Sequence, residues 1–314
     1  MNCDVLIVDA WWGLQSGMSK GVLTIKALPS YKDIPGVQYH FGRELLGRIQ
    51  QTLNDKILFY EPRRPSTDLN TRGGRSSYFA VATPVRIRPD LDPDFPDHYF
   101  CDLENYVDFL RPVGFKEGGL YYESGLQKAD GSTNKGQFGQ SVRIIPDHEF
   151  EAILAAGFAD ILPGFSPTSA VQDNEEPLEV DRPLVDITTS KPFRDRAFKR
   201  SVREAYGNRC AITGFAIFNE RGSPEVQAAH IRPVSDKGSD SVRNGLALTG
   251  TIHWMFDKGL LAVADDMRIL VAEKYVPPEV IDLINPTGSL KLPADRTKWP
   301  HPSFIAHHRA SFLG

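Results

Sequence analysis

The stretch that decides the C-terminal fold is EVQAAHIRPVSDKGSDSVRNGLALTGTIHWMFDKG, residues 225–259. Residues 226–231 form a short, mostly apolar run closed by a proline, as expected for a strand. A polar loop follows and ends in an Asn-Gly pair at residues 244–245, which is typical of a turn. Residues 246–248 predict the return strand, and Thr251 is the expected cap of a following helix. The stretch therefore predicts strand, loop, strand and helix.

Two histidines and a carboxylate in this stretch have the chemistry of a phosphodiester hydrolase. His253 and Asp257 are four residues apart, so on a helix both side chains project from one face and can hold one cation. His230 ends the first strand, from which a neutral imidazole can take a proton from water while the metal neutralises a scissile phosphate. A lone histidine before a proline is more often a surface or core residue. The ordered combination favours a one-metal nuclease.

The motifs in this stretch resemble a known nuclease family. AAHIRP, NGLAL and HWMFDKG, in this order, are similar to the A-H-I-x-P, N-G-L-x-L and H-x-x-F-D-x-G signature of HNH (ββα-metal) endonucleases. The resemblance covers about residues 193–272. It implies that His230 is the general base, that His253 and Asp257 bind the metal, and that Asn244 holds the loop by backbone hydrogen bonds. The implied catalytic residues are His230, Asn244 and His253.

One residue departs from the pattern of this family. Many relatives carry an acidic or histidine ligand just before the base, whereas this chain has Ala229. Water, a DNA phosphate or Gln227 is left to complete the metal site. The resemblance implies a divalent cation, Mg²⁺ or Mn²⁺ with Zn²⁺ as an alternative, and products with a 5′-phosphate and a 3′-hydroxyl.

Composition places the chain among soluble globular proteins. It has 314 residues, of which 41% are hydrophobic and 24% charged, enough for two domains of ordinary size. No run of 18 apolar residues and no basic leader is present, so we expect no membrane span, no secretory signal and a cytoplasmic location. The cysteines, at positions 3, 101 and 210, are too far apart for a zinc pair, and Cys210 is expected in the C-terminal core.

The charge distribution separates two regions. The formal net charge is −4, but residues 191–258 contain 12 Lys and Arg against 7 Asp and Glu, which suits a phosphate-lined groove. Residues 172–186 contain six acids and one arginine, within a proline-rich stretch. We therefore predict a recognition domain at residues 1–162, a linker at 163–191 and a nuclease domain at 192–314.

The N-terminal region predicts short strands with one early helix. Strands are expected at residues 5–12, an apolar run, and at 22–28, 56–61, 77–82, 85–88, 98–103, 106–109 and 141–145, and helices at 43–53 and 148–156. The phrases DKILFYEPRR, GGRSSYFAVATPVRI and HYFCDLENYVDFLRPV resemble PUA-like domains of the EVE and SRA kind. The predicted fold class is α+β, with an N-terminal mixed α/β PUA-like barrel and a C-terminal ββα-metal domain.

The PUA-like resemblance implies nucleic-acid binding and, in several lineages, capture of a flipped modified base. Eight strand aromatics are available to line such a pocket, although strand aromatics are usually core: Tyr39, Phe59, Tyr60, Tyr78, Phe79, Tyr99, Phe100 and Tyr106. The arginines Arg63, Arg64 and Arg75 flank a polar loop and are phosphate-contact candidates, with a solvated loop as the alternative. The glycine-rich residues 118–140 predict a long mobile loop.

A basic amphipathic helix is predicted just before the nuclease hairpin. Residues 193–206 place Phe198 and Val202 on one side. Its basic residues, Arg196, Lys199, Arg200 and Arg203, are expected to track the DNA backbone, with an ordinary solvated face as the alternative. After the hairpin we expect a second hairpin at residues 260–272 and two short helices. The tail histidines His301, His307 and His308 are expected at the surface or facing DNA.

The sequence thus predicts a metal-dependent HNH DNA endonuclease, specifically a modification-dependent restriction enzyme. Its expected partner is double-stranded DNA, base-modified in the restriction hypothesis. A homing or repair nuclease acting on unmodified DNA and a catalytically inactive DNA-binding protein are the alternatives. One active site per chain favours a homodimer for cutting both strands. We also expect residues 187–314 alone to retain weak nicking.

Overall fold

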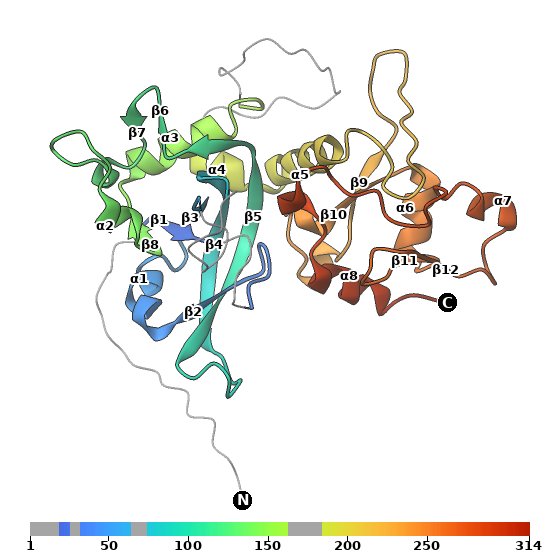
Figure 1. The fold of residues 1–314 in the computed structure, drawn as a ribbon, viewed down its shortest axis with the longest axis horizontal. Coiled ribbons are helices and arrows are strands. Elements are labelled where there is room, and N and C mark those ends of the chain that lie inside the picture. The colour runs from blue at the N-terminus through green and yellow to red at the C-terminus, as the bar shows by residue number, and fades with distance from the viewer. Residues whose placement is uncertain (1–18, 26–31, 64–73, 163–183) are drawn as a thin grey trace, which may run out of the picture.

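The computed structural model describes residues 19–25, 32–63, 74–162 and 184–314. Figure 1 shows a curled sheet with its helices and a C-terminal part of short strands and helices, with α5 running between them. This is the predicted α+β class. The apolar run at residues 5–12, Cys3 and most of the predicted linker lie outside the described residues.

A six-stranded sheet forms the N-terminal part. Its strands are β1 (Gly21–Thr24), β2 (Gln38–Gly42), β3 (Ile57–Glu61), β4 (Ser77–Pro89), β5 (His98–Gly114) and β8 (Val142–Ile144). The order across the sheet is β2-β5-β4-β3-β1-β8. Neighbours pair antiparallel except β1 and β3, which are parallel. β2 and β8 are therefore the edge strands of the curled sheet that Figure 1 shows.

Strands β4 and β5 are longer than the sequence predicts. We expected each to be two strands, separated near Pro84 and near Asn105, but both continue through these positions. The pairing of β4 with β5 shifts register between Val81 and Thr83 and again at Pro84. A β-bulge inserts an extra residue without ending a strand, which is why residues that signal a break are accommodated here.

Helices cover the sheet, and a long segment beside it is folded. The turn η1 (Arg43–Leu45) leads into α1 (Leu46–Gln51), and α3 (Asp147–Gly157) and α4 (Leu184–Thr189) follow the last strand. Residues 118–140 contain β7 (Leu120–Tyr121), η2 (Ser124–Leu126) and α2 (Lys135–Phe138), and β6 (Lys116–Glu117) precedes them. The buried Glu123 accepts a hydrogen bond from Tyr78 at 2.5 Å and forms an ion pair with Arg143 at 2.7 Å. The predicted mobile loop is therefore wrong for this segment.

Helix α5 (Lys191–Ala205) belongs to two hydrophobic cores. Its first half contributes Phe193 and Ala197 to a cluster formed with the N-terminal sheet and α3. Its second half contributes Phe198 and Val202 to the cluster of the C-terminal part. All four side chains are at most 2% exposed. A single rigid helix therefore fixes the sheet relative to the C-terminal part.

The predicted strand, loop, strand and helix are present. β9 (Gln227–His230) pairs antiparallel with β10 (Gly245–Leu248), and α6 (Gly250–Asp257) follows. The helix cap differs from the prediction, because Thr249 rather than Thr251 occupies the N-cap and its side chain makes no capping hydrogen bond. The Glu225 carboxylate instead accepts a hydrogen bond from the Gly250 amide at 2.8 Å. A carboxylate at a helix N-terminus also complements the helix dipole.

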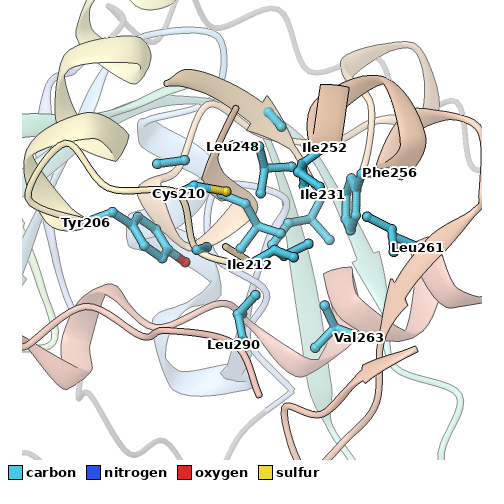
Figure 2. Packing of buried hydrophobic residues seen from close by; sticks show 14 of the residues in the cluster. Tyr206, Cys210, Ile212, Ile231, Leu248, Ile252, Phe256, Leu261, Val263 and Leu290 are labelled. Atoms are coloured by element: carbon cyan, nitrogen blue, oxygen red, sulfur yellow. The ribbon is translucent and has the colours of Figure 1, made fainter. Parts of the chain in front are cut away.

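The remaining C-terminal elements complete one core around this hairpin. Figure 2 shows Cys210, Ile231, Leu248 and Phe256 packed together, so Cys210 is in the core as predicted. The elements are η3 (Val234–Asp236), η4 (Val242–Asn244), β11 (Leu261–Val263), β12 (Ile269–Val271), α7 (Pro278–Ile281), η5 (Arg296–Lys298) and α8 (Pro302–Arg309). In the part of the chain that the structure describes, no helix is long and apolar enough to cross a membrane.

The tail histidines differ from the prediction at two of three positions. The His308 ring stacks on Phe256 with 3.6 Å between centroids, and its Nε2 lies 3.0 Å from the Phe256 carbonyl oxygen. His301 caps α8, where its Nδ1 accepts a hydrogen bond from the Ser303 amide. Only His307 is exposed. The two others are structural residues because their ring nitrogens bind backbone groups inside the fold.

Gly245 is a glycine because α5 approaches it closely. The Asn-Gly pair does not form the predicted tight turn, since Gly245 is the first residue of β10 and has an extended backbone with φ of −126°. A Cβ atom at Gly245 would lie 2.3 Å from Val202 Cγ2 and 3.1 Å from the Phe198 ring. The absent side chain therefore permits α5 to pack against the hairpin opposite His230, its register partner.

We expect Gly245→Ala to lower the free energy of unfolding by about 1–3 kcal/mol, because overpacking forces neighbouring side chains from their rotamers. Urea denaturation measures the change. Gly250→Ala is the matched control, since the nearest atom to a Cβ there is Glu225 Oε1 at 3.6 Å. Equal stability of both variants would contradict the close packing of α5 on β10.

Candidate active site

His230 lies at the end of β9, half-buried against α5. Its ring stacks on Phe198 with 3.9 Å between centroids and 9° between planes. Its Nε2 lies 3.1 Å from Oδ1 of Asp240, a buried residue in the loop between β9 and β10. The ring is therefore held on one flat side by α5 and at one nitrogen by a carboxylate.

The ionisation of Asp240 determines which nitrogen of His230 carries the proton. Burial raises the pKa of this carboxyl, but hydrogen bonds from His230 and Arg194 outweigh it and lower the pKa below the usual value. An ionised carboxylate only accepts hydrogen bonds, so the facing Nε2 carries the proton. The geometry leaves Nδ1 as the nitrogen able to take a proton from water.

Sequence reasoning missed Asp240 and Arg194. Arg194 Nε donates to Asp240 Oδ2 at 3.0 Å, which gives the carboxylate a second donor beside His230 and one that carries a positive charge. Asp240 is one of two aspartates in the loop SDKGSD, and nothing in the spacing distinguishes it from Asp236. Only the folded position of α5 identifies the aspartate that faces the histidine.

Asn244 is fully buried and binds the loop backbone at three points. Its Nδ2 donates to the carbonyl oxygens of Arg232 and Ser239, both at 2.9 Å, and its Oδ1 accepts from the Arg232 amide at 2.9 Å. Its own carbonyl accepts from the Ile231 amide at 2.8 Å. These bonds close the loop directly after His230 and bring Asp240 back beside the ring.

His253 and Asp257 lie together on α6. His253 Nε2 is 3.6 Å from Asp257 Oδ2, and His253 Nδ1 is 2.8 Å from Oε1 of Gln227 on β9. A neutral imidazole that donates from Nδ1 to the amide oxygen presents its Nε2 lone pair beside the carboxylate. Gln227 is thus placed to orient the histidine ring of this pair.

The hairpin separates these two groups of side chains. Gln227 and His230 are three residues apart on β9, so alternation places them on opposite faces of the strand. His230 faces α5, whereas Gln227 contacts α6. Among the described residues no hydrogen bond or ion pair joins His230 to His253 or Asp257. The structure therefore shows the candidate base and the candidate metal ligands as two separate groups of the same hairpin.

Residues 210–264 match the family model described as HNH endonuclease. The chain contains an HNH endonuclease domain. The match includes β9, β10 and α6 and thus every residue of the predicted catalytic set. It does not extend to residues 31–161, so the PUA-like resemblance of that region stays a prediction.

Two solved structures show low similarity to the whole chain. "Modification dependent TagI restriction endonuclease" is 15% identical with a TM-score of 0.30, and the match covers 93% of this chain and 81% of that one. "Structure of the Type IV phosphorothioation-dependent restriction endonuclease ScoMcrA" is 16% identical with a TM-score of 0.20, and the match covers 76% of this chain and 52%, about half, of that one. No curated protein matches the chain.

His253 and Asp257 are the candidate metal ligands of the HNH domain, with one facing atom each. Neighbouring ligands at ~2.1 Å would lie ~3.0 Å apart on an octahedral cation and ~3.4 Å apart on a tetrahedral one, so the 3.6 Å between His253 Nε2 and Asp257 Oδ2 would shorten by a few tenths of an ångström on binding. In the described ranges no group of three or more His, Cys, Asp or Glu side chains surrounds a common point. Ala229 is fully buried in the core and adds no ligand. The donor set fits a cation that keeps positions open for water and phosphate.

The basic residues of α5 are partly engaged within the protein. Arg200 pairs with Glu204 at 2.7 Å and Asp160 at 3.7 Å, and Arg203 Nε donates to the Val226 carbonyl at 3.0 Å. Lys199 is exposed, and Arg196 is half-buried. Two of the four basic residues, Arg200 and Arg203, are therefore held in intramolecular contacts, and DNA binding by this helix stays a prediction.

The three arginines near the 63–75 loop have different surroundings. Arg63 is exposed, and Arg64 lies outside the described residues. Arg75 donates from Nε to the buried Glu61 at 2.5 Å, and its guanidinium lies 4.2 Å from the Phe79 ring centroid. Arg75 is therefore part of a wall within the fold rather than a free loop residue.

That wall belongs to a cavity of about 480 Å³ between the sheet and the HNH domain. Phe59, Phe79 and Tyr106 line it from the sheet, while Arg243 and His301 line it from the C-terminal part. Of the eight strand aromatics, six are buried, as the core interpretation predicts, and Phe79 and Tyr99 are half-buried. Phe59 and Tyr106 are thus buried in the core and also line the cavity.

Two carboxyls and a histidine of the cavity have displaced pKa values. Burial raises the pKa of Asp33 to about 7, against a hydrogen bond from the His40 amide. Burial also raises the pKa of Asp108, against hydrogen bonds from Val242 and Tyr106. Burial lowers the pKa of His301 to about 4, and the neighbouring Arg243 adds to this. The cavity therefore favours neutral groups.

These shifts predict opposite pH effects on stability. The folded pKa of His301 is below the unfolded value of 6.5, so the unfolded chain binds the proton first and the unfolding free energy falls from pH 6.5 to 4. The folded pKa of Asp33 is above the unfolded value of 3.8, so the folded chain holds this proton more tightly. The resulting contribution to the free energy of unfolding is fully present below pH 3.8 and is lost as pH rises through about 7.

We expect His301→Asn, which keeps a capping oxygen, to remove a stability loss on the order of 2 kcal/mol between pH 6.5 and 4, after allowance for solvent screening. Asp33→Asn, which keeps the acceptor for the His40 amide, should remove the loss of stability that the wild type shows as pH rises from about 4 to 7. Urea unfolding at several pH values measures both. Identical pH slopes in the wild type and both variants would show that neither group is displaced.

Proposed function

We propose that this protein is a metal-dependent DNA endonuclease in which His230 is the general base. The observation that carries the proposal is the His230–Asp240 contact at the end of β9, inside the family-matched hairpin. Asp240 fixes the proton on Nε2, which leaves the Nδ1 lone pair as the group that would accept a proton from water. Asn244 keeps the loop closed and thereby keeps Asp240 beside the ring.

His253 and Asp257 are the proposed metal ligands, with Gln227 orienting the imidazole. A bound Mg²⁺ or Mn²⁺, with Zn²⁺ as the alternative, would neutralise charge on the scissile phosphate and the leaving oxygen. His253 and Asp257 would hold this cation, and water and a DNA phosphate would take its remaining positions. Exposed Lys199 of α5 is the first candidate for a neighbouring phosphate contact.

We expect the wild type to cleave duplex DNA only with added Mg²⁺ or Mn²⁺, leaving 5′-phosphate ends. His230→Ala should reduce the single-turnover rate by about 10²-fold or more while DNA affinity stays near normal, because the proton acceptor is lost and phosphate contacts are kept. Quantified plasmid nicking and gel shifts measure the two effects.

The tail histidine His307 provides the control for this experiment. It is exposed and lies outside the family-matched residues, so His307→Ala should cleave at the wild-type rate. His253→Ala and Asp257→Ala should weaken metal binding in calorimetry. Wild-type cleavage by a folded His230→Ala protein would remove His230 from the mechanism, and no cleavage of any DNA by the wild type would favour an inactive DNA-binding protein.

We further propose that the enzyme restricts modified DNA and that the cavity between the sheet and the HNH domain receives the modified base. The cavity volume exceeds that of one nucleobase, and its walls combine aromatic rings with hydrogen-bonding carboxyls, the groups that hold an extruded base. A homing or repair enzyme would need no such discrimination. Because each chain has one HNH domain, cleavage of both strands would use two chains.

We expect the full-length His230→Ala protein to bind duplexes with one cytosine or adenine modification at least ten-fold more tightly than unmodified duplexes. Phe79→Ala should reduce that preference, because Phe79 is the half-buried aromatic of the cavity wall. Half-buried Tyr99, which does not line the cavity, is the matched control position. Equal affinity across the panel, with cleavage intact in the wild type, would favour an enzyme for unmodified DNA.

A further inference from the structure

The support of His230 does not end within the HNH domain. Arg194, which donates to Asp240 through Nε, also donates through Nη1 to Asn105 Oδ1 at 2.6 Å. Asn105 belongs to β5 of the N-terminal sheet. Three consecutive polar contacts therefore connect this sheet to the ring of His230, by way of Arg194 and Asp240.

The backbone of β5 is shaped to present Asn105. Val81 pairs with Val107 and Thr83 pairs with Glu104, so two residues of β5, Asn105 and Tyr106, oppose one residue of β4. Asn105 has φ of +52°, in the left-handed region that asparagine tolerates better than most residues. A bulge of this kind redirects a side chain out of the regular pleat. Here it permits Asn105 to reach α5.

The loop that carries Asp240 is also attached to the sheet through its backbone. Asp240 forms a parallel β-bridge with Val107, and the Val242 amide donates to Asp108 Oδ2 at 2.7 Å. Ser239 Oγ donates to the Pro35 carbonyl at 2.8 Å. Successive residues of the loop are therefore held by the N-terminal part, on both sides of the aspartate that faces His230.

We propose that the N-terminal sheet positions the catalytic base, with Asn105 acting through Arg194 and Asp240 to set the orientation of the His230 ring. This inference rests on the proposed nuclease function and adds that the sheet is needed for the cleavage step as well as for the choice of DNA. Asn105, Arg194 and Asp240 are positioning residues, because none of them needs to touch DNA.

For the isolated residues 187–314, this proposal predicts less cleavage than the sequence analysis does. Residues 187–314 would retain Arg194 and Asp240 but lose Asn105, the Val107 bridge and the Asp108 carboxylate. They would also expose Phe193 and Ala197, which are fully buried against the sheet. The weak nicking that we expected of this fragment should therefore be absent or strongly reduced, even if the hairpin forms.

The decisive variant in the full-length protein is Asn105→Gly. Glycine adopts positive φ without strain, so the substitution removes the side chain and keeps the bulge. We expect the single-turnover cleavage rate to fall about ten-fold or more, since small misplacement of a reacting group is costly, while DNA affinity and the unfolding midpoint stay close to wild type. Asn105→Asp keeps the acceptor oxygen for Arg194 and should restore most of the rate.

Asn54→Gly is the matched control, because Asn54 also has positive φ, lies in the N-terminal part and is exposed. It should cleave at the wild-type rate. Arg194→Lys is the second variant, which shortens the reach to Asn105 and Asp240 and should also reduce the cleavage rate. Wild-type rates in both Asn105→Gly and Arg194→Lys, with His230→Ala inactive, would overturn the proposal and leave the nuclease function intact.

A spectroscopic measurement separates this proposal from the nuclease function itself. Side-chain nitrogen NMR reports which ring nitrogen of His230 carries the proton. We expect one neutral tautomer, protonated at Nε2, in the wild type and a mixture of tautomers in Asn105→Gly and Arg194→Lys. The same tautomer populations in all three proteins, whether a single tautomer or a mixture, would overturn the positioning role whether or not the wild type cleaves DNA.

Discussion

The carboxylate of Asp240 is the interaction on which the arrangement of the site depends. It is buried, and two donors, His230 and Arg194, compensate for the loss of hydration. Burying an ionised carboxylate costs free energy unless the charge is paired. Both donors are therefore needed to keep Asp240 ionised, and each donor binds the charge that the other helps to stabilise. The loop closed by Asn244 brings the carboxylate to the ring, and α5 brings the arginine. Hairpin, loop and helix are thus fixed relative to one another by one charged group.

The local part of this arrangement was predictable from the sequence, whereas the long-range part was not. The strand, loop, strand and helix follow from apolar runs and turn residues that are adjacent in the chain, and the HNH family match agrees with them. Asp240 acquires its importance from Arg194, 46 residues away, and from a β-bridge to Val107. No periodicity records such contacts. The Asn-Gly pair shows the same limit of sequence-based prediction. Gly245 has an ordinary extended backbone, and a side chain is excluded there because Val202 packs too closely.

The N-terminal sheet was predictable in its strands but not in their continuity. Proline and asparagine usually end strands, and here both occur within long strands at shifts in register. A bulge accommodates such residues within a strand. It loses fewer backbone hydrogen bonds than ending the strand would when the flanking segments pair on both sides. The core status of most strand aromatics followed from their usual environment. That Phe59 and Tyr106 also line a cavity depends on how the HNH domain is placed, which α5 decides.

One short segment of β5 serves the cavity and the hairpin together. Tyr106 and Asp108 line the cavity, while Asn105 and Val107 between and beside them contact Arg194 and Asp240. Side chains alternate along a strand, so neighbouring residues can serve two faces with one backbone. Asp108 belongs to both sets, because it accepts hydrogen bonds from the Tyr106 hydroxyl at 2.8 Å and from the Val242 amide, which lies between β9 and β10. A ligand that displaced Tyr106 or changed the ionisation of Asp108 would act directly on the loop that holds Asp240. The proposed recognition in the cavity and the proposed orientation of the base therefore share a backbone segment, and neither needs a large domain movement to influence the other.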